Sequence, residues 1–171
     1  IFAQGKDAGI PHARGNDDAP IRTATATILD CFPRCRRTGF YHDMTRTYSF
    51  GAVTPEVQKL YDDVKTVFDT IMSGLAVGEK TKSYQDQTCA MFRQRGHKVV
   101  EDHWPLEEGY CHSLGHGLGL EVHEPLAFSS FVDRGDKFEP GNVFTIEPGL
   151  YYPQKNMGVR IEDTVMCDPF G

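Results

Sequence analysis

No stretch of the 171-residue sequence approaches the roughly 18 apolar residues of a membrane-spanning helix. Glycine (17 residues) and proline (10 residues) interrupt the chain throughout, and a quarter of the residues are charged. This composition argues against a membrane span, a long coiled coil and a disordered tail. We therefore expect one globular domain, or part of one, with no membrane partner.

Basic residues are in the minority. The chain has 18 basic and 24 acidic residues, which gives a formal net charge of -6. Nucleic-acid binding requires a basic face that contacts phosphates, and the largest basic cluster here is the short group Arg34, Arg36 and Arg37, which we interpret as a solvated loop. The charge balance argues against a nucleic-acid partner and favours small molecules or peptides.

Cysteines are also few, and their spacing is not that of a disulfide framework. Their number, five, is odd, so at least one thiol is free. Cys31 and Cys35 have no second pair at zinc-finger spacing, so we expect ordinary thiols there. Free thiols indicate a reducing compartment, from which we expect a cytoplasmic protein.

Two amphipathic helices are expected in the middle of the chain. Thr54 is a suitable N-cap before Pro55 and Glu56, and apolar residues then recur at spacings of three and four until about Gly74. A second helix is expected over residues 83–95, ending at Gly96. We expect both helices to be scaffold.

Short strands are expected on both sides of these helices. Residues 21–32 and 40–50 predict a hairpin with a long connection. Further strands are expected over 118–122, 143–147 and 159–166, the last two forming a hairpin around residues 153–158. The expected fold class is α+β or mixed α/β.

Four acids follow apolar stretches, in two similar pairs. Asp30 and Asp43 belong to the first expected hairpin, and Glu147 and Glu162 to the second. If the first two strands pair, we expect Asp30 to face Asp43 with Cβ atoms about 5 Å apart. Buried carboxylates need a proton or a cation. Arg160 can balance one of them, whereas two divalent ions about 3.5–4 Å apart would balance all four.

Three histidines complete the chemically informative set. His112, His116 and His123 lie within twelve residues, interleaved with glycines that allow a close backbone approach. One imidazole beside four carboxylates favours manganese, cobalt, iron or zinc over calcium and magnesium. The glycines lack the spacing and the helix start of a phosphate loop, so no nucleotide is expected.

These segments, in this order, resemble the pita-bread metallopeptidase family, which contains methionine aminopeptidase, aminopeptidase P and prolidase. The resemblance runs from about residue 12 to residue 165, and the Glu-Pro-Gly-Leu-Tyr and Gly-Val-Arg-Ile-Glu-Asp forms look more like the Xaa-Pro peptidase branch. The matching pieces are Pro11-His12, Asp30, Asp43-Met44-Thr45-Arg46-Thr47, Gly115-His116-Gly117, Val122-His123-Glu124-Pro125, Glu147-Pro148-Gly149-Leu150-Tyr151 and Gly158-Val159-Arg160-Ile161-Glu162-Asp163-Thr164.

The resemblance implies an α+β pita-bread fold and a dinuclear metal centre, with manganese favoured. It implies hydrolysis of the Xaa-Pro bond in dipeptides or at a peptide N-terminus, and it is compatible with a homodimer. Glu147 would move a proton, His123 with His112 nearby would stabilise an oxyanion, and His12 would position the peptide. Arg160 is expected to contact Asp30. The resemblance implies five metal ligands, which are Asp30, Asp43, His116, Glu147 and Glu162. Asp43 and Glu162 would bridge the two metal ions.

The sequence departs from the family pattern in two ways. Asp30 and Asp43 are 13 residues apart, two more than in most of the family, and Cys31 to Arg34 replace the usual glycine. The chain is also short for this fold, so residues 1–171 are expected to form a single, partial catalytic domain truncated at both ends.

Two other functions remain as alternatives. A metal-independent amidinohydrolase of the creatinase type shares the fold, but it does not need the five ligands that are all present here. A catalytically silent relative could serve as a binding module. Loss of metal ligands or a basic surface would indicate such a relative. Neither mark is seen in this sequence.

Overall fold

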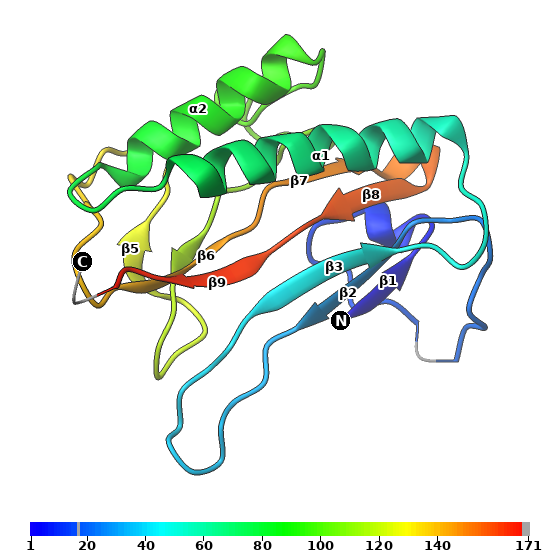
Figure 1. The fold of residues 1–171 in the computed structure, drawn as a ribbon. Helices are drawn as coiled ribbons and strands as arrows, with labels where there is room; N and C mark the ends of the chain where they lie inside the picture. The colour runs from blue at the N-terminus through cyan, green and yellow to red at the C-terminus, as the bar shows by residue number, and fades with distance from the viewer. Residues whose placement is uncertain (17, 169–171) are drawn as a thin grey trace.

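A computed structural model describes residues 1–16 and 18–168. Helices α1 and α2 lie together on one side of the strands (Figure 1). Helix α1 (Pro55–Gly74) begins as predicted, because the Thr54 hydroxyl accepts a hydrogen bond from the Val57 N–H and caps the first turn. Its buried residues, which face the strands, are Leu60, Val64, Val67, Phe68 and Ile71.

Helix α2 (Thr81–Gln94) starts two residues before the predicted position. It packs against α1 and against strand β5 (Glu124–Ala127). The main hydrophobic core lies between the helices and the strands and includes Phe92, Tyr110, Phe138 and Phe144. In the described part of the chain, no helix has the length and apolar character of a membrane span.

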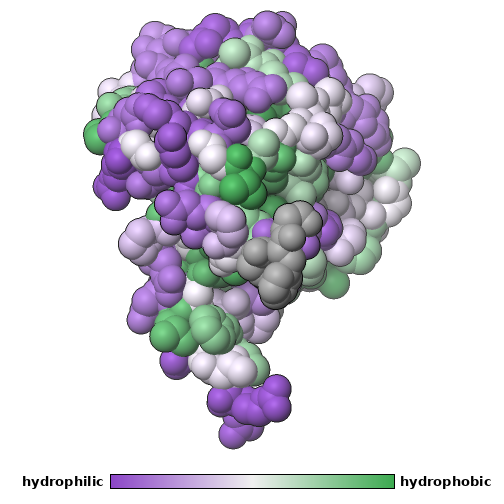
Figure 2. All heavy atoms as spheres, turned by 60° about the vertical axis from the view of Figure 1, so that its left-hand side comes forward, coloured by the Kyte–Doolittle hydropathy of each residue, from purple (hydrophilic) through white to green (hydrophobic). Residues whose placement is uncertain are grey.

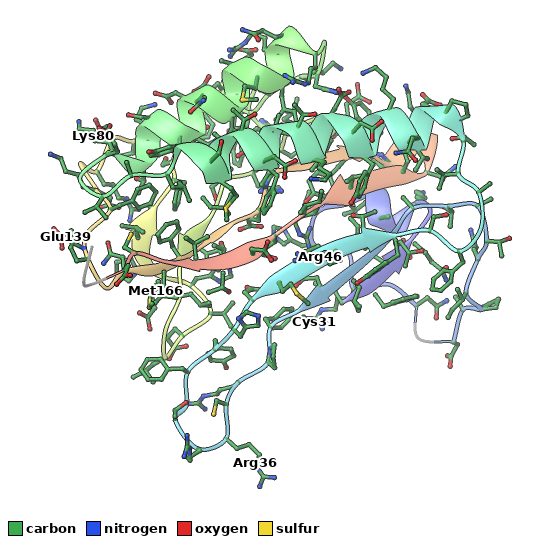
Figure 3. The ribbon with its side chains drawn as sticks, in the orientation of Figure 1. Cys31, Arg36, Arg46, Lys80, Glu139 and Met166 are labelled. Atoms are coloured by element: carbon green, nitrogen blue, oxygen red, sulfur yellow. The ribbon has the colours of Figure 1, made fainter. Side chains whose placement is uncertain are left out.

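The N-terminal sheet contains the predicted first hairpin. Its strands β1 (Phe2–Gln4), β2 (Thr27–Cys31) and β3 (Met44–Tyr48) pair antiparallel in the order β1-β2-β3. The two predicted strands are real but shorter than expected, and β1 was not predicted. Residues 32–43 extend away from the body of the molecule, with Arg36 at the end (Figures 1 and 3). Figure 2 shows that this projection ends in hydrophilic residues.

The second predicted hairpin is present, but both of its arms are interrupted. Strand β6 (Val143–Ile146) pairs with β9 (Asp163–Met166), and β7 (Gly149–Tyr152) pairs with β8 (Met157–Arg160). A 3-10 turn, η2 (Pro153–Lys155), connects β7 and β8. The prediction missed β7 and merged β8 with β9. Ile146 opposes Asp163 and Gly149 opposes Arg160, so one register continues through the break and places Glu147 opposite Glu162.

The strand predicted over residues 118–122 is wrong. Strand β4 (His116–Gly117) ends before this segment, which turns back toward β5. The Glu124 carboxylate accepts hydrogen bonds from the N–H groups of Leu120 and Glu121, and these bonds stabilise a turn instead of an extended strand. Strands β5, β4, β6 and β9 form a four-stranded sheet in that order.

A β-bridge between Thr45 and Glu162 joins the N-terminal sheet to the C-terminal strands. The backbone N–H and carbonyl groups of Thr45 and Glu162 exchange hydrogen bonds of 3.3 and 3.0 Å. The short 3-10 turn η1 (Asp7–Gly9) packs against β8 on the N-terminal side. Segments from near both ends of the described chain, η1 and β8, therefore pack together next to the N-terminal sheet.

Candidate active site

All nine residues predicted to act at the site line one cavity of about 360 Å³. We call this cavity the acid pocket. Its four acids lie where the strands begin, end or break: Asp30 in β2, Asp43 before β3, Glu147 after β6 and Glu162 before β9. The other five residues are His12, His112, His116, His123 and Arg160.

The two aspartates do not face each other directly, so that prediction is wrong. In the observed register Asp30 opposes Thr45. Asp43 lies two residues before Thr45, so it is diagonal to Asp30 across the ladder. The register is fixed by the pairing of Cys31 with Met44 at the base of the long connection. Because side chains alternate with a period of two, Asp30 and Asp43 still project from the same face.

Burial and mutual repulsion disfavour the charged forms of these acids. Burial, followed by the charge of Asp30, raises the pKa of Asp43 to about 6. Burial, followed by the charge of Asp43, raises the pKa of Glu162 to about 8. Burial and the charge of Glu162 raise the pKa of Glu147 well above its usual range. Without added positive charge, the pocket therefore holds protons at pH values where free carboxyl groups are ionised.

The residues present fit metal ions. Buried Oδ1 atoms of Asp30 and Asp43 have no hydrogen-bond partner in the described structure. Ligand atoms of Asp43, His116 and Glu162 lie within 4.8 Å of one another. His116 Nε2 is 3.8 Å from Asp43 Oδ2 and 3.6 Å from Glu147 Oε1. Atoms that bind one ion at about 2.0–2.2 Å lie roughly 3–4 Å apart, so this spacing suits a shared cation.

His116 is oriented as a metal ligand would be. Its Nδ1 is 3.0 Å from the Gly117 carbonyl, so that nitrogen carries the proton and Nε2 presents its lone pair to the acids. Burial lowers the pKa of His116, which favours the neutral form that binds metal. The neighbouring backbone is tightly packed, because a Cβ at Gly115 would lie 1.9 Å from the Thr145 carbonyl oxygen.

Arg160 is the cation that contacts the acids directly. Its Nη2 donates to Asp30 Oδ2 at 2.7 Å, which is the contact expected from the sequence, and its Nε donates to the Thr45 hydroxyl at 3.1 Å. The Thr45 hydroxyl in turn donates to Glu162 Oε2 at 2.6 Å. Arg160 thus balances the charge of Asp30 and helps to orient Glu162. The single charge of Arg160 does not balance all four carboxyl groups.

His112 is held by the protein on both sides of its ring. Its Nδ1 is 2.7 Å from the Ser113 carbonyl, and its Nε2 is 2.9 Å from the Tyr151 hydroxyl. Tyr151 also accepts a hydrogen bond from Arg160 Nη1 at 2.9 Å, so it donates its own proton to His112. Burial, followed by the charge of Arg160, lowers the pKa of His112 to about 3. This geometry favours an orienting role for His112 over direct contact with an oxyanion.

His123 and His12 border the open part of the acid pocket. The ring of His123 lies 4.3 Å from that of His116, centroid to centroid, and both His123 and His12 are exposed. His12 also lines a second, larger cavity. The positions of both rings leave them accessible to a ligand in the pocket.

Two contributors were not assigned a role from the sequence. Thr45 and Tyr151 stand in the quoted motifs, but only the structure shows that their hydroxyls connect Arg160 to Glu162 and to His112. The signal for Thr45 was available, because in a strand it lies on the same face as Asp43. Tyr151 lies in β7, the strand that the sequence analysis missed.

A second buried polar cluster supports the loop that carries His112 and His116. Gln85 Oε1 accepts hydrogen bonds from the Tyr110 hydroxyl at 3.0 Å and from the Leu114 N–H at 2.6 Å. Its Nε2 donates to the Ser130 hydroxyl at 2.7 Å. We call Gln85, Tyr110, Leu114 and Ser130 the Gln85 network; nothing in the helix periodicity of α2 pointed to it.

Comparisons with known proteins show the family to which the chain belongs. The model for metallopeptidase family M24 matches residues 1–169. Xaa-Pro aminopeptidase 1 of Streptomyces coelicolor is 32% identical, and the match covers 100% of this chain and 38% of that protein.

Solved structures give the same result. The prolidase from Pyrococcus horikoshii superposes with a TM-score of 0.85 at 28% identity, covering 99% of this chain and 44% of that one. The Xaa-Pro dipeptidase from Bacillus anthracis has a TM-score of 0.85 at 29% identity, covering 100% and 44%. The expected pita-bread fold is confirmed, and the chain spans less than half the length of these relatives.

Proposed function

The chain belongs to metallopeptidase family M24, and on that premise we propose that it hydrolyses the Xaa-Pro bond in dipeptides or at the N-terminus of peptides. The observation that carries the proposal is the acid pocket itself. Four carboxyl groups and the neutral imidazole of His116 converge on it, and two buried carboxylate oxygens have no partner in the described structure. The names of the relatives support the choice of the Xaa-Pro bond.

Two divalent ions are the proposed cofactors. Their four positive charges would balance the four acids, and the ligands would be Asp30, Asp43, His116, Glu147 and Glu162, with Asp43 and Glu162 bridging. The donor set favours manganese, with cobalt, zinc or iron as substitutes. When bound, such a pair supplies Lewis-acid chemistry that lowers the pKa of water and polarises a carbonyl group.

The remaining residues would handle the peptide and its protons. Glu147 would take a proton from the attacking water and give it to the leaving nitrogen of proline. His123 would donate to the oxygen of the scissile carbonyl, and His12 would position the peptide. His112 would keep the pocket wall in place through Tyr151 and Arg160, which also fixes the Asp30 carboxylate.

Metal content and peptide cleavage should be measured together. Elemental analysis should find about two divalent ions per chain, and the release of the first residue from an Xaa-Pro peptide should require added manganese. Glu147→Ala should abolish this release. Glu107→Ala, at an exposed glutamate outside the pocket, should leave it intact.

Three outcomes would contradict the proposal. Cleavage that survives complete metal removal would point to metal-independent chemistry of the creatinase type. Absence of both metal and cleavage after reconstitution would indicate a silent relative that serves as a binding module. Cleavage of peptides without proline at equal rates would refute the proposed substrate class.

A further inference from the structure

A second cavity, of about 600 Å³, adjoins the acid pocket. The two cavities share Pro11, His12, His112 and His116, so a ligand that occupies one can extend into the other. We call the second cavity the aromatic pocket, after the three large rings in its wall, Trp104, Phe128 and Phe131. Its size is in the range of pockets that bind small organic ligands, about 300–1,000 Å³.

Two of these rings are exposed yet already arranged against each other. Trp104 is 70% exposed and Phe131 is 57% exposed. Their ring centroids lie 5.4 Å apart with an interplanar angle of 69°, although the two residues belong to separate loops. An edge-to-face pair of this kind offers a preformed apolar surface, and covering it with an apolar group would release water from both rings.

Several polar groups in the wall are already engaged by the protein. Among the described residues that line the aromatic pocket there is no lysine or arginine, and the one acid is Glu124, whose carboxylate accepts the two turn N–H groups. The Ser129 hydroxyl accepts from the N–H groups of Phe131 and Val132, and Ser130 binds Gln85. The wall therefore suits an uncharged apolar group and would disfavour a charged one.

We propose that the aromatic pocket binds the side chain of the residue after proline, and that the enzyme prefers peptides of at least three residues with a large apolar third residue. This inference rests on the proposed function. A peptidase that removes one residue has a short substrate segment before the cleaved bond and a longer one after it. The larger cavity, which opens to solvent at Trp104 and Phe131, suits the longer segment.

Tripeptides that differ only in their third residue test the proposal. We expect the metal-loaded protein to show a kcat/KM for Ala-Pro-Phe at least about tenfold above that for Ala-Pro-Ala. In Trp104→Ala and Phe131→Ala this ratio should fall to near one, because the Phe substrate loses its apolar contacts. Phe50→Ala, at an exposed ring outside the pocket, is the matched control and should keep the wild-type ratio. Equal values for the two substrates in the wild type would overturn the proposal.

A binding measurement separates this inference from the proposed function. Trp104 is the single tryptophan of the chain, so its fluorescence reports directly on the aromatic pocket. Pro-Phe should change this fluorescence with a Kd at least about tenfold below that of Pro-Ala. If no Xaa-Pro peptide is cleaved, the proposed function fails, and this titration still decides the pocket: equal affinities, or no response to Pro-Phe, would overturn it.

Discussion

The acid pocket and the Gln85 network are both buried and polar, but they are satisfied in opposite ways. In the Gln85 network each polar group of the central side chain has a protein partner at 2.6–3.0 Å. In the acid pocket the Oδ1 atoms of Asp30 and Asp43 have none in the described structure, and burial, followed by neighbouring charges, raises the pKa values of Asp43 and Glu162. The first cluster stabilises the fold by itself, whereas the second stabilises it only with a ligand.

The contrast explains how the site is supported. Gln85 accepts a hydrogen bond from the Leu114 N–H, which lies between His112 and His116. The Gln85 network therefore fixes the loop that carries these two histidines into the acid pocket. Function and stability are thus assigned to different residues a short distance apart. Substitutions in the two clusters should therefore have opposite effects on activity and on the stability of the metal-free protein.

The largest effect is expected for Glu162→Gln. The amide can still accept the Thr45 hydrogen bond, but it removes a proposed bridging ligand, so peptide cleavage should fall at least about 10³-fold and metal content should drop. The unfolding free energy of the metal-free variant at pH 8 should equal or exceed that of the wild type, because repulsion is relieved. Kinetics, elemental analysis and urea unfolding would check this. A variant that is much less stable without metal would contradict the comparison.

Gln85→Leu should have the reverse profile. Leucine fills similar space but leaves the Tyr110 hydroxyl and the Leu114 N–H buried without an acceptor, so the unfolding free energy should fall by roughly 2–4 kcal/mol. Urea unfolding of the metal-free protein would measure this loss. Ser130→Ala, which removes only the third bond, should cost about 1 kcal/mol, and equal losses in the two variants would argue against a network centred on Gln85.

Metal removal should make stability depend on pH in one direction. Folding raises the pKa of Asp43 to about 6 and that of Glu162 to about 8, whereas it lowers the pKa values of His112 and His116. Above about pH 7 these histidines are neutral in both states, so between about pH 7 and pH 8 the acids of the pocket hold more protons in the folded chain than in the unfolded chain. The unfolding free energy therefore falls as pH rises through this range, and the Tm with chelator should be roughly 5 °C lower at pH 8 than at pH 7. Added manganese should remove this fall, as measured by calorimetry. A chelated Tm that rises with pH would refute the repulsion.

The smallest effect is expected on the exposed face of α1. Lys65 and Asp69 form an ion pair one helical turn apart, with side chains 52% and 55% exposed. Lys65→Ala should change the unfolding free energy by less than about 0.5 kcal/mol and leave cleavage unaffected. This variant calibrates the other measurements, since a loss above 1 kcal/mol would show that surface pairs matter here as much as buried networks do.

Sequence reasoning grouped the candidate residues more accurately than it placed the strands around them. Residues such as Asp30, Glu147 and Glu162 stand out because acids after apolar runs are costly to bury, and all nine predicted residues do line one pocket. The break between β8 and β9 was not visible, because Ile161 and Glu162 continue the alternation of apolar and polar residues that Val159 and Arg160 begin. Register also escaped prediction, since the pairing of Asp30 with Thr45 depends on how the long connection closes.

Gln85 shows a different limit of sequence information. On the periodicity of α2 it is one polar residue among several, and its burial becomes evident only when Tyr110 and Leu114, which lie 25 and 29 residues away, fold against it. Local pattern identifies residues whose chemistry is unusual. It does not identify an ordinary side chain whose partners are distant in the chain.

The bridge between Thr45 and Glu162 has a consequence for folding kinetics. It joins residues that are 117 positions apart, so the loop that it closes spans about two thirds of the 171-residue chain, and such non-local contacts form slowly. The acids on either side of it can assemble only after this closure. Bound ions would then act as a cross-link between the two ends of the chain, and they would slow unfolding in the way that a staple across a long loop does.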